Sequence, residues 1–348
     1  MRTIDWQDGA VVIVDQTALP ADLRILRLET VDALVDAIAR LAVRGAPALG
    51  AAGGLGVALA AVIADREGAP LDQAVPAEAE KVRAARPTAV NLAWGVDRVL
   101  ARLDEGVDVV VAEAVAMLDE DVATNQRIGA RGADLLADLH PGPVRLLTHC
   151  NTGSLACVDW GTALGVARTL HQRGLLGEVF ANETRPLLQG ARLTTWELRE
   201  MGATHRLVVD SAGPTVVAQG MVDAVIVGAD RIAANGDVVN KVGTYPQALA
   251  AARAGLPFIV AAPESTIDLN TATGADIHIE ERGGDEVTRW GGVSSAPEGT
   301  ATLNLAFDVT PADLVTAIVT EARVIRPALG ERPSDPLPAA SVASGTAG

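Results

Sequence analysis

The sequence has little of the chemistry that holds small secreted domains and metal centres together. Its 348 residues include two cysteines, Cys150 and Cys157, and five scattered histidines. Two cysteines form neither a disulfide framework nor a zinc site, and the histidines show no metal-ligand spacing. No G-x-G-x-x-G motif follows a predicted strand, which argues against a dinucleotide. We therefore expect no metal and no cofactor.

Positive charge is also scarce. The formal net charge is −16 and the sequence pI is about 4.7. This balance argues against a nucleic-acid partner, which needs a basic face. Lys81 and Lys241 are the only lysines among 28 basic side chains. A coding preference for arginine explains that shortage, but a rare lysine at the end of a strand also suits a site that needs a point charge.

One long run carries no charge at all. Residues 46–64 approach the length of a membrane span. Alanine and glycine dominate the run, and these residues favour membrane insertion only weakly. We interpret it as a buried helix whose glycines allow close helix contact, so no membrane partner is expected. No signal-peptide pattern opens the chain, and we expect the protein in the cytoplasm.

The pattern of the chain changes at Pro141-Gly142-Pro143. Before it, two β-like runs, Ala10–Val14 and Leu23–Leu28, precede helical periodicity at 31–43, 48–66, 71–84, 89–104 and 108–139. After it, helices alternate with strand-like runs at Val144–Thr148, Glu178–Ala181, Arg206–Val209, Ala224–Val227, Phe258–Ala261 and Ile277–Ile279. The pattern predicts an α/β protein: a small N-terminal sheet plus a helical bundle, then a doubly wound, mostly parallel sheet. We expect domains at 1–140 and 141–330, and a flexible tail at 331–348.

The predicted strands end in polar, mostly small residues, in the segments THCNTG, ANETRP, DSAG, GADRI and APEST. Ligands of open α/β sheets bind beyond the carboxyl ends of the strands, so five such ends predict a shared polar crevice. Strand ends are often polar in such folds, which is the alternative explanation. The run Ala224–Val227 delivers Asp230 and Arg231 to this edge.

A carboxylate at that position is expected to be buried with a raised pKa. A salt bridge from Asp230 to an arginine, or a cap on the next turn, is an equally open interpretation. Asn235-Gly236-Asp237 is typical of a tight turn. We expect Asn240-Lys241 to open the next helix, where backbone N–H groups and a lysine suit a phosphate.

Cys150 lies between a predicted strand and the Asn151-Thr152-Gly153 turn. A thiol in such a place can have a lowered pKa, although a buried cysteine acting as a small hydrophobe is commoner. His149 is adjacent, but successive strand residues point to opposite faces, so we predict no catalytic dyad. Cys157 is expected in the following helix with a structural role.

Arginines recur beside glycine and proline in tight loops. Arg44 starts the break Arg44-Gly45-Ala46-Pro47 between two helices, and Arg86 precedes Pro87. A guanidinium matches phosphate with two parallel hydrogen bonds, although each arginine alone is more simply a solvated surface residue. The Gln189 amide precedes a predicted helix at Ala191–Met201, where it can bind a sugar hydroxyl or the start of the helix.

Long segments of the chain resemble the methylthioribose-1-phosphate isomerase family of the methionine salvage pathway. They are RGAPALG (44–50), RPTAVNLAWGVDR (86–98), THCNTGSLA (148–156), ANETRPLLQGARLTTWEL (181–198), GADRIAANGDVVNKVGTY (228–245) and APESTID (262–268). The resemblance implies a Rossmann-like C-terminal domain, a homodimer and a sugar-phosphate substrate. It also implies catalytic roles for Cys150 and Asp230. The substrate contacts it implies are Arg44, Gly45, Ala46, Arg86, Gln189, Asn240 and Lys241.

The implied reaction is an aldose–ketose isomerisation of 5-methylthioribose 1-phosphate. Asp230 would be the general acid that protonates the ring oxygen, provided that its pKa is raised, and Cys150 would stabilise the transition state or shuttle the C2 proton. A hydride shift is the competing route. Trp94, Leu187 and Leu188 are candidates for an apolar pocket around the methylthio group.

Other activities stay open at this stage. The substrate range can extend to 5-deoxyribose 1-phosphate, whose C5 end is also small and uncharged. A related isomerase acts on ribose 1,5-bisphosphate, which would need a second cationic pocket. The same superfamily contains the regulatory alpha, beta and delta subunits of a eukaryotic translation-initiation exchange factor, which need no catalytic pair.

Overall fold

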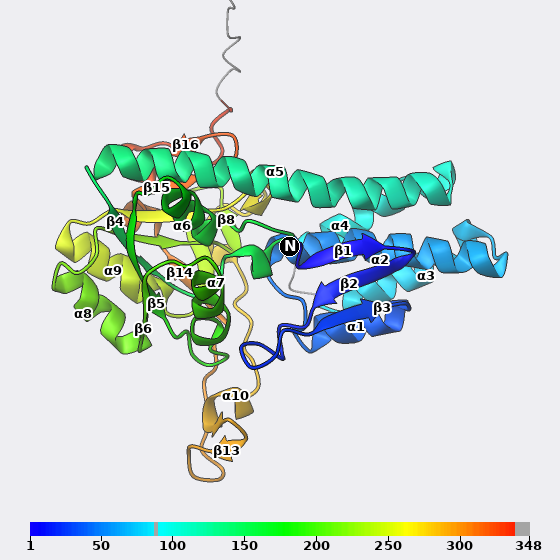
Figure 1. Ribbon diagram of the computed structural model, residues 1–348, viewed down its shortest axis with the longest axis horizontal. Coiled ribbons are helices and arrows are strands. Elements are labelled where there is room, and N and C mark those ends of the chain that lie inside the picture. Colours follow the sequence, from blue (N-terminus) through cyan, green and yellow to red (C-terminus); the bar gives the residue numbers. More distant parts are fainter. Residues whose placement is uncertain (87–89, 338–348) are drawn as a thin grey trace, which may run out of the picture.

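The computed structural model describes residues 1–86 and 90–337. The chain opens with an antiparallel sheet in the order β1-β2-β3 (Figure 1). Its strands are β1 (Ile4–Gln7), β2 (Ala10–Val14) and β3 (Ile25–Leu28). The sequence predicts only the second and third of these strands. The first is short and mixes apolar with polar residues, so its pairing with β2 rather than its own composition defines it.

Five α-helices follow, close to the predicted ranges. They are α1 (Val31–Ala39), α2 (Ala46–Glu67), α3 (Leu71–Ala84), α4 (Val90–Leu100) and α5 (Val107–Leu139). Helix α1 ends before the predicted Val43 because Leu41 adopts a left-handed backbone with φ of 63°. This turn redirects the chain so that Arg44 lies at the entrance of α2.

Helix α2 is the centre of the N-terminal part. Among the described residues it is the one helix long and apolar enough to cross a membrane, yet 78% of that apolar window is buried inside the protein. Its glycines bring it against α4: a β-carbon at Gly95 would lie 2.0 Å from the carbonyl oxygen of Gly50. A β-carbon at Gly53 would lie 2.4 Å from the carbonyl oxygen of Leu92. The prediction of a buried, glycine-packed helix is therefore confirmed.

Helix α5 is shared by two cores. Its first half contributes Val110 and Leu118 to the core around α2, and its second half contributes Ile128 and Leu136 to the core of the large sheet. Figure 1 shows it running along both parts. A boundary at residue 140 therefore follows a helix that belongs to both parts, and the domain limits 1–140 and 141–330 stay a prediction.

The large sheet has the order β16-β15-β10-β7-β4-β5-β6. Its strands are β4 (Val144–Thr148), β5 (Leu176–Asn182), β6 (His205–Val208), β7 (Ala224–Val227), β10 (Phe258–Ala261), β15 (Ala317–Val319) and β16 (Val324–Ile325). All pairings are parallel except that of β15 with β16. The strand order reverses between β4 and β7, which makes this pair the topological switch point of the sheet.

Alternate strand residues bury two faces of this sheet. Leu146 and Ile226 pack on one face with α5 and α6 (Ala163–Gln172). Leu147 and Val225 pack on the other with α8 (Gly213–Ala218) and α9 (Thr244–Ala254). Helices on both faces of a mostly parallel sheet confirm the predicted doubly wound class.

A smaller sheet covers the carboxyl edge, in the order β11-β8-β9-β14. Its strands are β11 (Ile267–Asp268), β8 (Arg231–Ala233), β9 (Val238–Lys241) and β14 (Phe307–Thr310). The turn at Asn235-Gly236-Asp237 is confirmed, with φ of 93° at Gly236. The prediction that Asn240-Lys241 opens a helix is wrong. These residues pair with β14 in the ladder, and α9 starts only at Thr244.

The predicted strand Ile277–Ile279 is also wrong. This segment is irregular and follows a short 3₁₀ turn at Gly274–Asp276. The place next to β10 in the sheet is taken by β15 instead, so Ile277–Ile279 has no strand beside it to pair with. Two residues of the segment, Ile277 and His278, line a cavity. An apolar run alone does not distinguish a strand from an irregular segment that lines a cavity.

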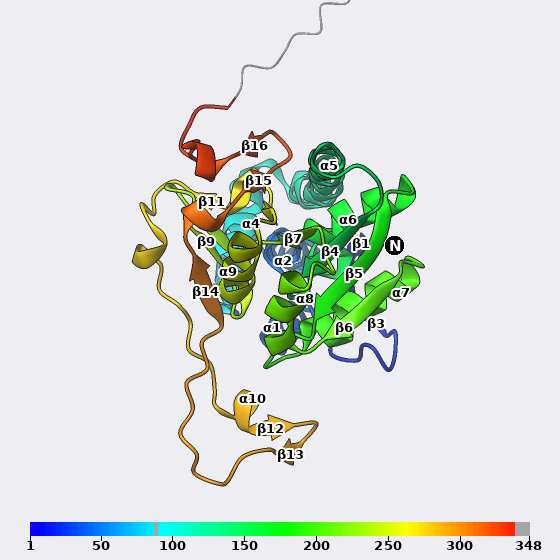
Figure 2. The same cartoon turned by 90° about the vertical axis from the view of Figure 1, so that its left-hand side faces the viewer.

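Residues 282–304 form an arm that leaves the body of the protein (Figures 1 and 2). It contains α10 (Asp285–Thr288), β12 (Arg289–Trp290) and β13 (Val293–Ser294). Its base is closed by a 2.8 Å hydrogen bond from the Arg282 N–H to the Asn304 carbonyl oxygen. The start of the predicted tail is tied to the body of the protein, because the Pro333 carbonyl oxygen accepts a hydrogen bond from Arg323 at 2.8 Å. Residues 338–348 of that tail lie outside the described residues.

The contact between α2 and α4 makes a stability prediction. Gly95→Ala places a methyl group where the Gly50 carbonyl oxygen lies, so the two helices must separate. We expect a loss of about 1–3 kcal/mol in the free energy of unfolding, measured by urea denaturation. The control is Gly283→Ala, because nothing lies within 4 Å of the added carbon there. Equal stability of the two variants would contradict this account of the packing.

Candidate active site

A cavity lies beyond the carboxyl ends of β4 and β7, at the switch point of the large sheet. Residues from both parts of the chain line it. All nine sequence-predicted site residues are among them: Arg44, Gly45, Ala46, Arg86, Cys150, Gln189, Asp230, Asn240 and Lys241. Two strands that are neighbours in space but far apart in sequence therefore deliver Cys150 and Asp230 to one place.

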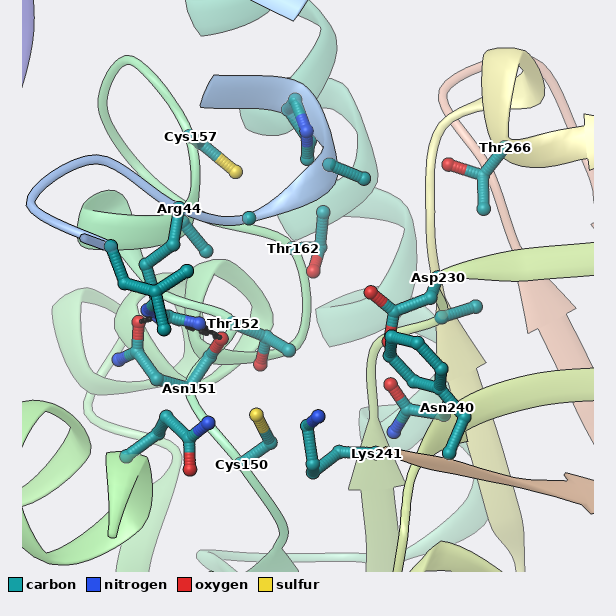
Figure 3. Close-up of a pocket in the computed structure, with 18 of the residues that line it drawn as sticks. Arg44, Cys150, Asn151, Thr152, Cys157, Thr162, Asp230, Asn240, Lys241 and Thr266 are labelled. Carbon is teal, nitrogen blue, oxygen red and sulfur yellow. Dashed lines mark hydrogen bonds between the residues drawn. The ribbon is translucent and has the colours of Figure 1, made fainter. Parts of the chain in front are cut away.

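Figure 3 shows how the side chains face the cavity. Arg44, Asn151 and Cys150 lie on one wall, and Asp230 and Lys241 lie on the opposite wall. The thiol of Cys150 and the ammonium of Lys241 point into the same space. A ligand in this cavity therefore meets an acid, a thiol and basic groups from opposite sides.

Cys150 has a strained backbone that two threonines hold. Its φ is 65°, a left-handed conformation that residues with a β-carbon rarely adopt. Its N–H donates to Thr184 Oγ1 at 2.8 Å, and Thr194 Oγ1 donates to its carbonyl oxygen at 2.6 Å. This arrangement aims the side chain at the cavity rather than along the strand.

The pKa of Cys150 is raised, whereas its position between a strand and a turn suggests a lowered pKa. Burial raises the pKa of the thiol, and the nearby Arg44 and Lys241 offset only part of that effect. The turn after Cys150 leads to a 3₁₀ turn at Ser154–Ala156 rather than to a long helix, so it supplies no helix end to stabilise a thiolate. Burial therefore favours the thiol over the thiolate.

His149 does not line this cavity, and Cys157 lines it but has a hydrogen-bond partner of its own. The Nε2 of His149 donates to the Val242 carbonyl oxygen at 2.8 Å, and its Nδ1 accepts from the Asn182 amide at 3.2 Å. The prediction that His149 forms no dyad with Cys150 is confirmed. Cys157 follows the 3₁₀ turn instead of lying in a helix, and its thiol donates to Asn125 Oδ1 at 3.7 Å.

Asp230 is an acid among bases, and its side chain is exposed to solvent through the open cavity, so the prediction that this carboxylate is buried is wrong. The protein atoms packed around the cavity still desolvate the carboxyl group enough to raise its pKa, while Lys241, Arg86 and Arg44 act in the opposite direction with a smaller total effect. The neighbouring Arg231 does not neutralise it, because that guanidinium pairs with Asp268 at 3.5 Å. The site therefore favours the protonated acid more than water does.

Two of the cationic groups are held by neutral partners. Arg44 donates from Nε to Gln16 Oε1 at 3.1 Å, and from Nη2 to the amide and carbonyl oxygens of Asn151. Lys241 donates to the Ala306 carbonyl oxygen at 2.8 Å, and its Nζ lies 4.4 Å from the centroid of the Phe307 ring. None of these contacts is a carboxylate, so both charges remain available to an anion.

The N-terminus of α2 adds backbone donors to this cationic set. Gly45 precedes the helix with φ of 97°, and Ala46 is its first residue. Both line the cavity. A helix start presents free N–H groups and the positive end of the helix dipole, which suit a phosphate. A β-carbon at Gly45 would lie 2.4 Å from the Ala156 carbonyl oxygen, so only glycine fits there.

Three buried polar atoms that line the cavity have no hydrogen-bond partner within the described part of the chain. They are Gln189 Oε1, Thr152 Oγ1 and Thr266 Oγ1. Buried polar groups are normally satisfied, so unpartnered ones in a cavity point to a ligand rich in hydroxyl groups. Thr152 and Thr266 were not predicted from the sequence, although both lie in the polar strand-end segments.

Other lining residues refine the prediction. Arg282, from the base of the arm, reaches the cavity but pairs with Glu280 and Glu286. Of the three candidates for the methylthio pocket, Leu187 lines the cavity, whereas Trp94 and Leu188 are not among its lining residues. Within residues 1–86 and 90–337, no group of three or more histidine, cysteine or acidic side chains could hold a metal ion.

Comparison with known proteins identifies a family and several relatives of this chain. Residues 42–327 match the initiation factor 2 subunit family. A protein of Anaeromyxobacter sp. (strain K) named methylthioribose-1-phosphate isomerase is 54% identical over 94% of each chain. A protein of Moorella thermoacetica named 5-deoxyribose 1-phosphate isomerase is 50% identical, covering 93% of this chain and 94% of its own.

A third relative is longer. The probable bifunctional methylthioribose-1-phosphate isomerase/methylthioribulose-1-phosphate dehydratase of Nocardia farcinica is 56% identical over 96% of this chain, which spans 61% of that relative. Among solved structures, 5-methylthioribose 1-phosphate isomerase from Pyrococcus horikoshii has a TM-score of 0.87 and 41% identity, covering 94% of this chain and 92% of its own. Translation initiation factor eIF-2B, subunit delta, from A. fulgidus has a TM-score of 0.84 and 44% identity, covering 94% and 96%.

The raised pKa of Asp230 makes a prediction about pH and stability. Since the folded-state pKa of Asp230 lies above the unfolded value, its contribution to stability is full below the unfolded pKa. That contribution is lost as pH rises through the folded pKa. Replacing it by a neutral amide in Asp230→Asn should therefore benefit stability more at pH 8 than at pH 4, measured by urea denaturation of both proteins.

Asp237→Asn is the control with the opposite sign. Burial works to raise the pKa of Asp237, but hydrogen bonds from Asn235 and from the backbone N–H groups of Gly274 and Ala312 lower it overall. That carboxylate stabilises the fold above its unfolded pKa, and the effect is lost in acid. The deficit of Asp237→Asn should therefore shrink as pH falls. A pH-independent difference for Asp230→Asn would contradict the raised pKa.

Proposed function

The chain belongs to the initiation factor 2 subunit family, and on that premise we propose that it isomerises 5-methylthioribose 1-phosphate to 5-methylthioribulose 1-phosphate. This aldose–ketose isomerisation is a step of methionine salvage. One observation carries the proposal: the acid Asp230 and the thiol of Cys150 line the same cavity as Arg44 and Lys241, which are held by neutral partners.

The 1-phosphate binds at the N-terminus of α2 in this proposal. Gly45 and Ala46 at the start of that helix line the cavity together with Arg44 and Arg86. Lys241 adds its charge from the opposite wall. Gln189, Thr152 and Thr266 supply polar atoms for the sugar hydroxyls. The phosphate anchors the sugar so that its ring lies between the two walls.

Asp230 acts first, as the general acid. The phosphate on the anomeric oxygen blocks ring opening by simple hemiacetal chemistry. The bond between C1 and the ring oxygen must therefore break as that oxygen takes a proton from Asp230. A raised pKa keeps this carboxyl group protonated to a higher pH than an aspartate in water, which favours it as the proton donor. The nearby cations then stabilise the carboxylate that is left.

Hydrogen transfer from C2 to C1 completes the reaction. The resting thiol of Cys150 is neutral, so it is not a base in the free site. After its first step, Asp230 is a carboxylate that can accept the C2 proton, and Cys150 stabilises the transition state beside it. Reprotonation at C1 and loss of the C2 hydroxyl proton give the ketose. A direct hydride shift would instead carry the C2 hydrogen to C1 without exchange.

The C5 end of the substrate separates the related activities. Leu41, Leu187 and Phe307 give the cavity apolar surface that suits a methylthio group or the methyl group of 5-deoxyribose 1-phosphate. Ribose 1,5-bisphosphate would need a second cationic site, but Arg282 is paired with Glu280 and Glu286. The cavity therefore favours an uncharged C5 end.

A regulatory subunit of a translation-initiation factor is the second candidate function, since one solved relative carries that name. Such a subunit needs no acid and no thiol facing each other across a cavity. The unpartnered Gln189 oxygen favours a bound sugar phosphate, and therefore an enzyme. The hydrogen bonds of Arg44 to uncharged groups favour the same function, because they leave its charge for the phosphate. The cytoplasmic location stays part of the proposal.

The activity test uses the purified chain. We expect conversion of 5-methylthioribose 1-phosphate, with turnover of 5-deoxyribose 1-phosphate and little or none of ribose 1,5-bisphosphate. Asp230→Asn should lower kcat by about 10²–10⁴-fold with the KM changed much less, because a general acid acts mainly in the transition state. Cys150→Ser should also lower kcat.

Several outcomes would contradict this. Failure of the wild-type chain to turn over any sugar 1-phosphate would leave the regulatory role. An unchanged kcat in Asp230→Asn would remove the general acid. In D2O, the proton-transfer route predicts deuterium at C1 of the product, whereas hydrogen retained wholly at C1 would establish the hydride shift.

The homodimer makes a separate prediction. The arm exposes Trp290, Val293 and Leu303, with 70% of the Val293 side chain accessible. We expect a second copy of the chain to bury this apolar surface. Val293→Asp should then shift the protein toward the monomer in sedimentation velocity, while Glu298→Asp on the same arm should not. Monomeric wild-type protein at micromolar concentration would contradict the proposal.

A further inference from the structure

We propose that Glu197 is a positioning residue of the phosphate site: it fixes the orientation of the Asn151 amide, and thereby holds Arg44. The inference rests on the proposed function, since it concerns the same site. Glu197 does not touch the cavity that holds Cys150 and Asp230. It acts through two other side chains, in the order Glu197, Asn151, Arg44.

Glu197 is a buried carboxylate surrounded by donors. It lies in α7 (Thr195–Glu200), directly after the π-helical turn Gly190–Thr194, and only 6% of it is exposed. Its Oε1 accepts from Asn151 Nδ2 at 2.7 Å and from the Leu155 N–H at 3.4 Å. Its Oε2 accepts from the N–H and the hydroxyl of Ser154, both at 2.7 Å. Four donors fill both oxygens.

The hydrogen-bond partners of the Asn151 side-chain amide fix the positions of its nitrogen and its oxygen. Burial raises the pKa of Glu197, but both of its oxygens already accept from backbone N–H groups, those of Ser154 and Leu155. The Asn151 nitrogen, a donor, must therefore face Glu197. A guanidinium only donates, so the amide oxygen must face Arg44, to which it is hydrogen bonded. Both constraints select the same orientation of the amide. Thr194 supports it, because its hydroxyl accepts from Asn151 Nδ2 at 3.3 Å.

This arrangement solves an electrostatic problem. A carboxylate in direct contact with Arg44 would neutralise the charge that a phosphate needs. Asn151 separates the two charges, so Glu197 orders the guanidinium without forming an ion pair with it. Gln16 holds the other side of Arg44 in the same neutral way, and its own amide donates to the Leu155 carbonyl oxygen at 2.6 Å.

Glu197→Gln tests the proposal. The glutamine amide has nearly the same shape but also donates, so the Asn151 amide can reverse and present its nitrogen to Arg44. We expect the KM for the sugar phosphate, and the dissociation constant for inorganic phosphate measured by calorimetry, to rise about tenfold. The kcat should change much less, because Glu197 touches no reacting group.

Ser154→Ala is the matched control. It removes another hydrogen bond to Glu197 but leaves the contact with Asn151 intact. A general loss of structure around Glu197 would raise the KM in both variants, whereas loss of the orientation of Asn151 affects only Glu197→Gln. Thermal melting of both variants measures any damage to the fold directly.

A double-variant cycle provides the decisive comparison. In the Arg44→Ala background, Glu197→Gln should have little further effect on phosphate affinity, because the group through which it acts is gone. Full additivity of the two effects would overturn the proposal, as would an unchanged phosphate affinity in Glu197→Gln. The calorimetric measurement needs no turnover, so absence of isomerase activity in the wild type refutes the proposed function without deciding this test.

Discussion

Partial desolvation of the Asp230 carboxyl group at the wall of an open cavity is the constraint on which the site depends. It shifts this group toward the neutral acid, and Lys241, Arg86 and Arg44 limit that effect without reversing it. The position follows from topology: β4 and β7 are adjacent where the strand order reverses, so the segments after them meet over one crevice. The Asp230 side chain itself stays accessible to solvent through the cavity. The protein atoms packed around that cavity, rather than complete burial, therefore raise its pKa.

The cations of the site differ from those elsewhere in the chain in what holds them. Arg98 lies between Glu113 and Glu120, and most surface arginines have a carboxylate partner of this kind. Arg44 and Lys241 are instead held by amide or carbonyl oxygens. In a protein with a net charge of −16, such local isolation from carboxylates is what allows an anionic ligand to bind. Neutral acceptors order the cations, and the charge is left for the phosphate.

The sequence predicts those features that local pattern determines, and misses those that depend on distant partners. The strand Ala224–Val227 and the position of Asp230 beyond it follow from an apolar run and its polar end. The apolar run Ile277–Ile279 does not form a strand, although its pattern predicts one. Whether a run joins a sheet depends on which strand occupies the neighbouring position. Lys241 lies in a ladder rather than in a helix because β14, more than sixty residues later in the chain, pairs with it. Gln16 carries no signal at all, since its role exists only once two distant loops meet.

The site stores unfavourable free energy that the packing around it must offset. A left-handed Cys150, an acid with a raised pKa and three unpartnered polar atoms each oppose folding in the absence of ligand. The compensation comes from rigid neighbours: α2 and α4 pack with backbones in contact, and α5 joins both cores. Two threonines and Glu197 transmit that rigidity to Cys150 and Asn151 through hydrogen bonds. A sugar phosphate that satisfies the unpartnered atoms relieves part of the cost, so binding and stability are coupled in the same residues.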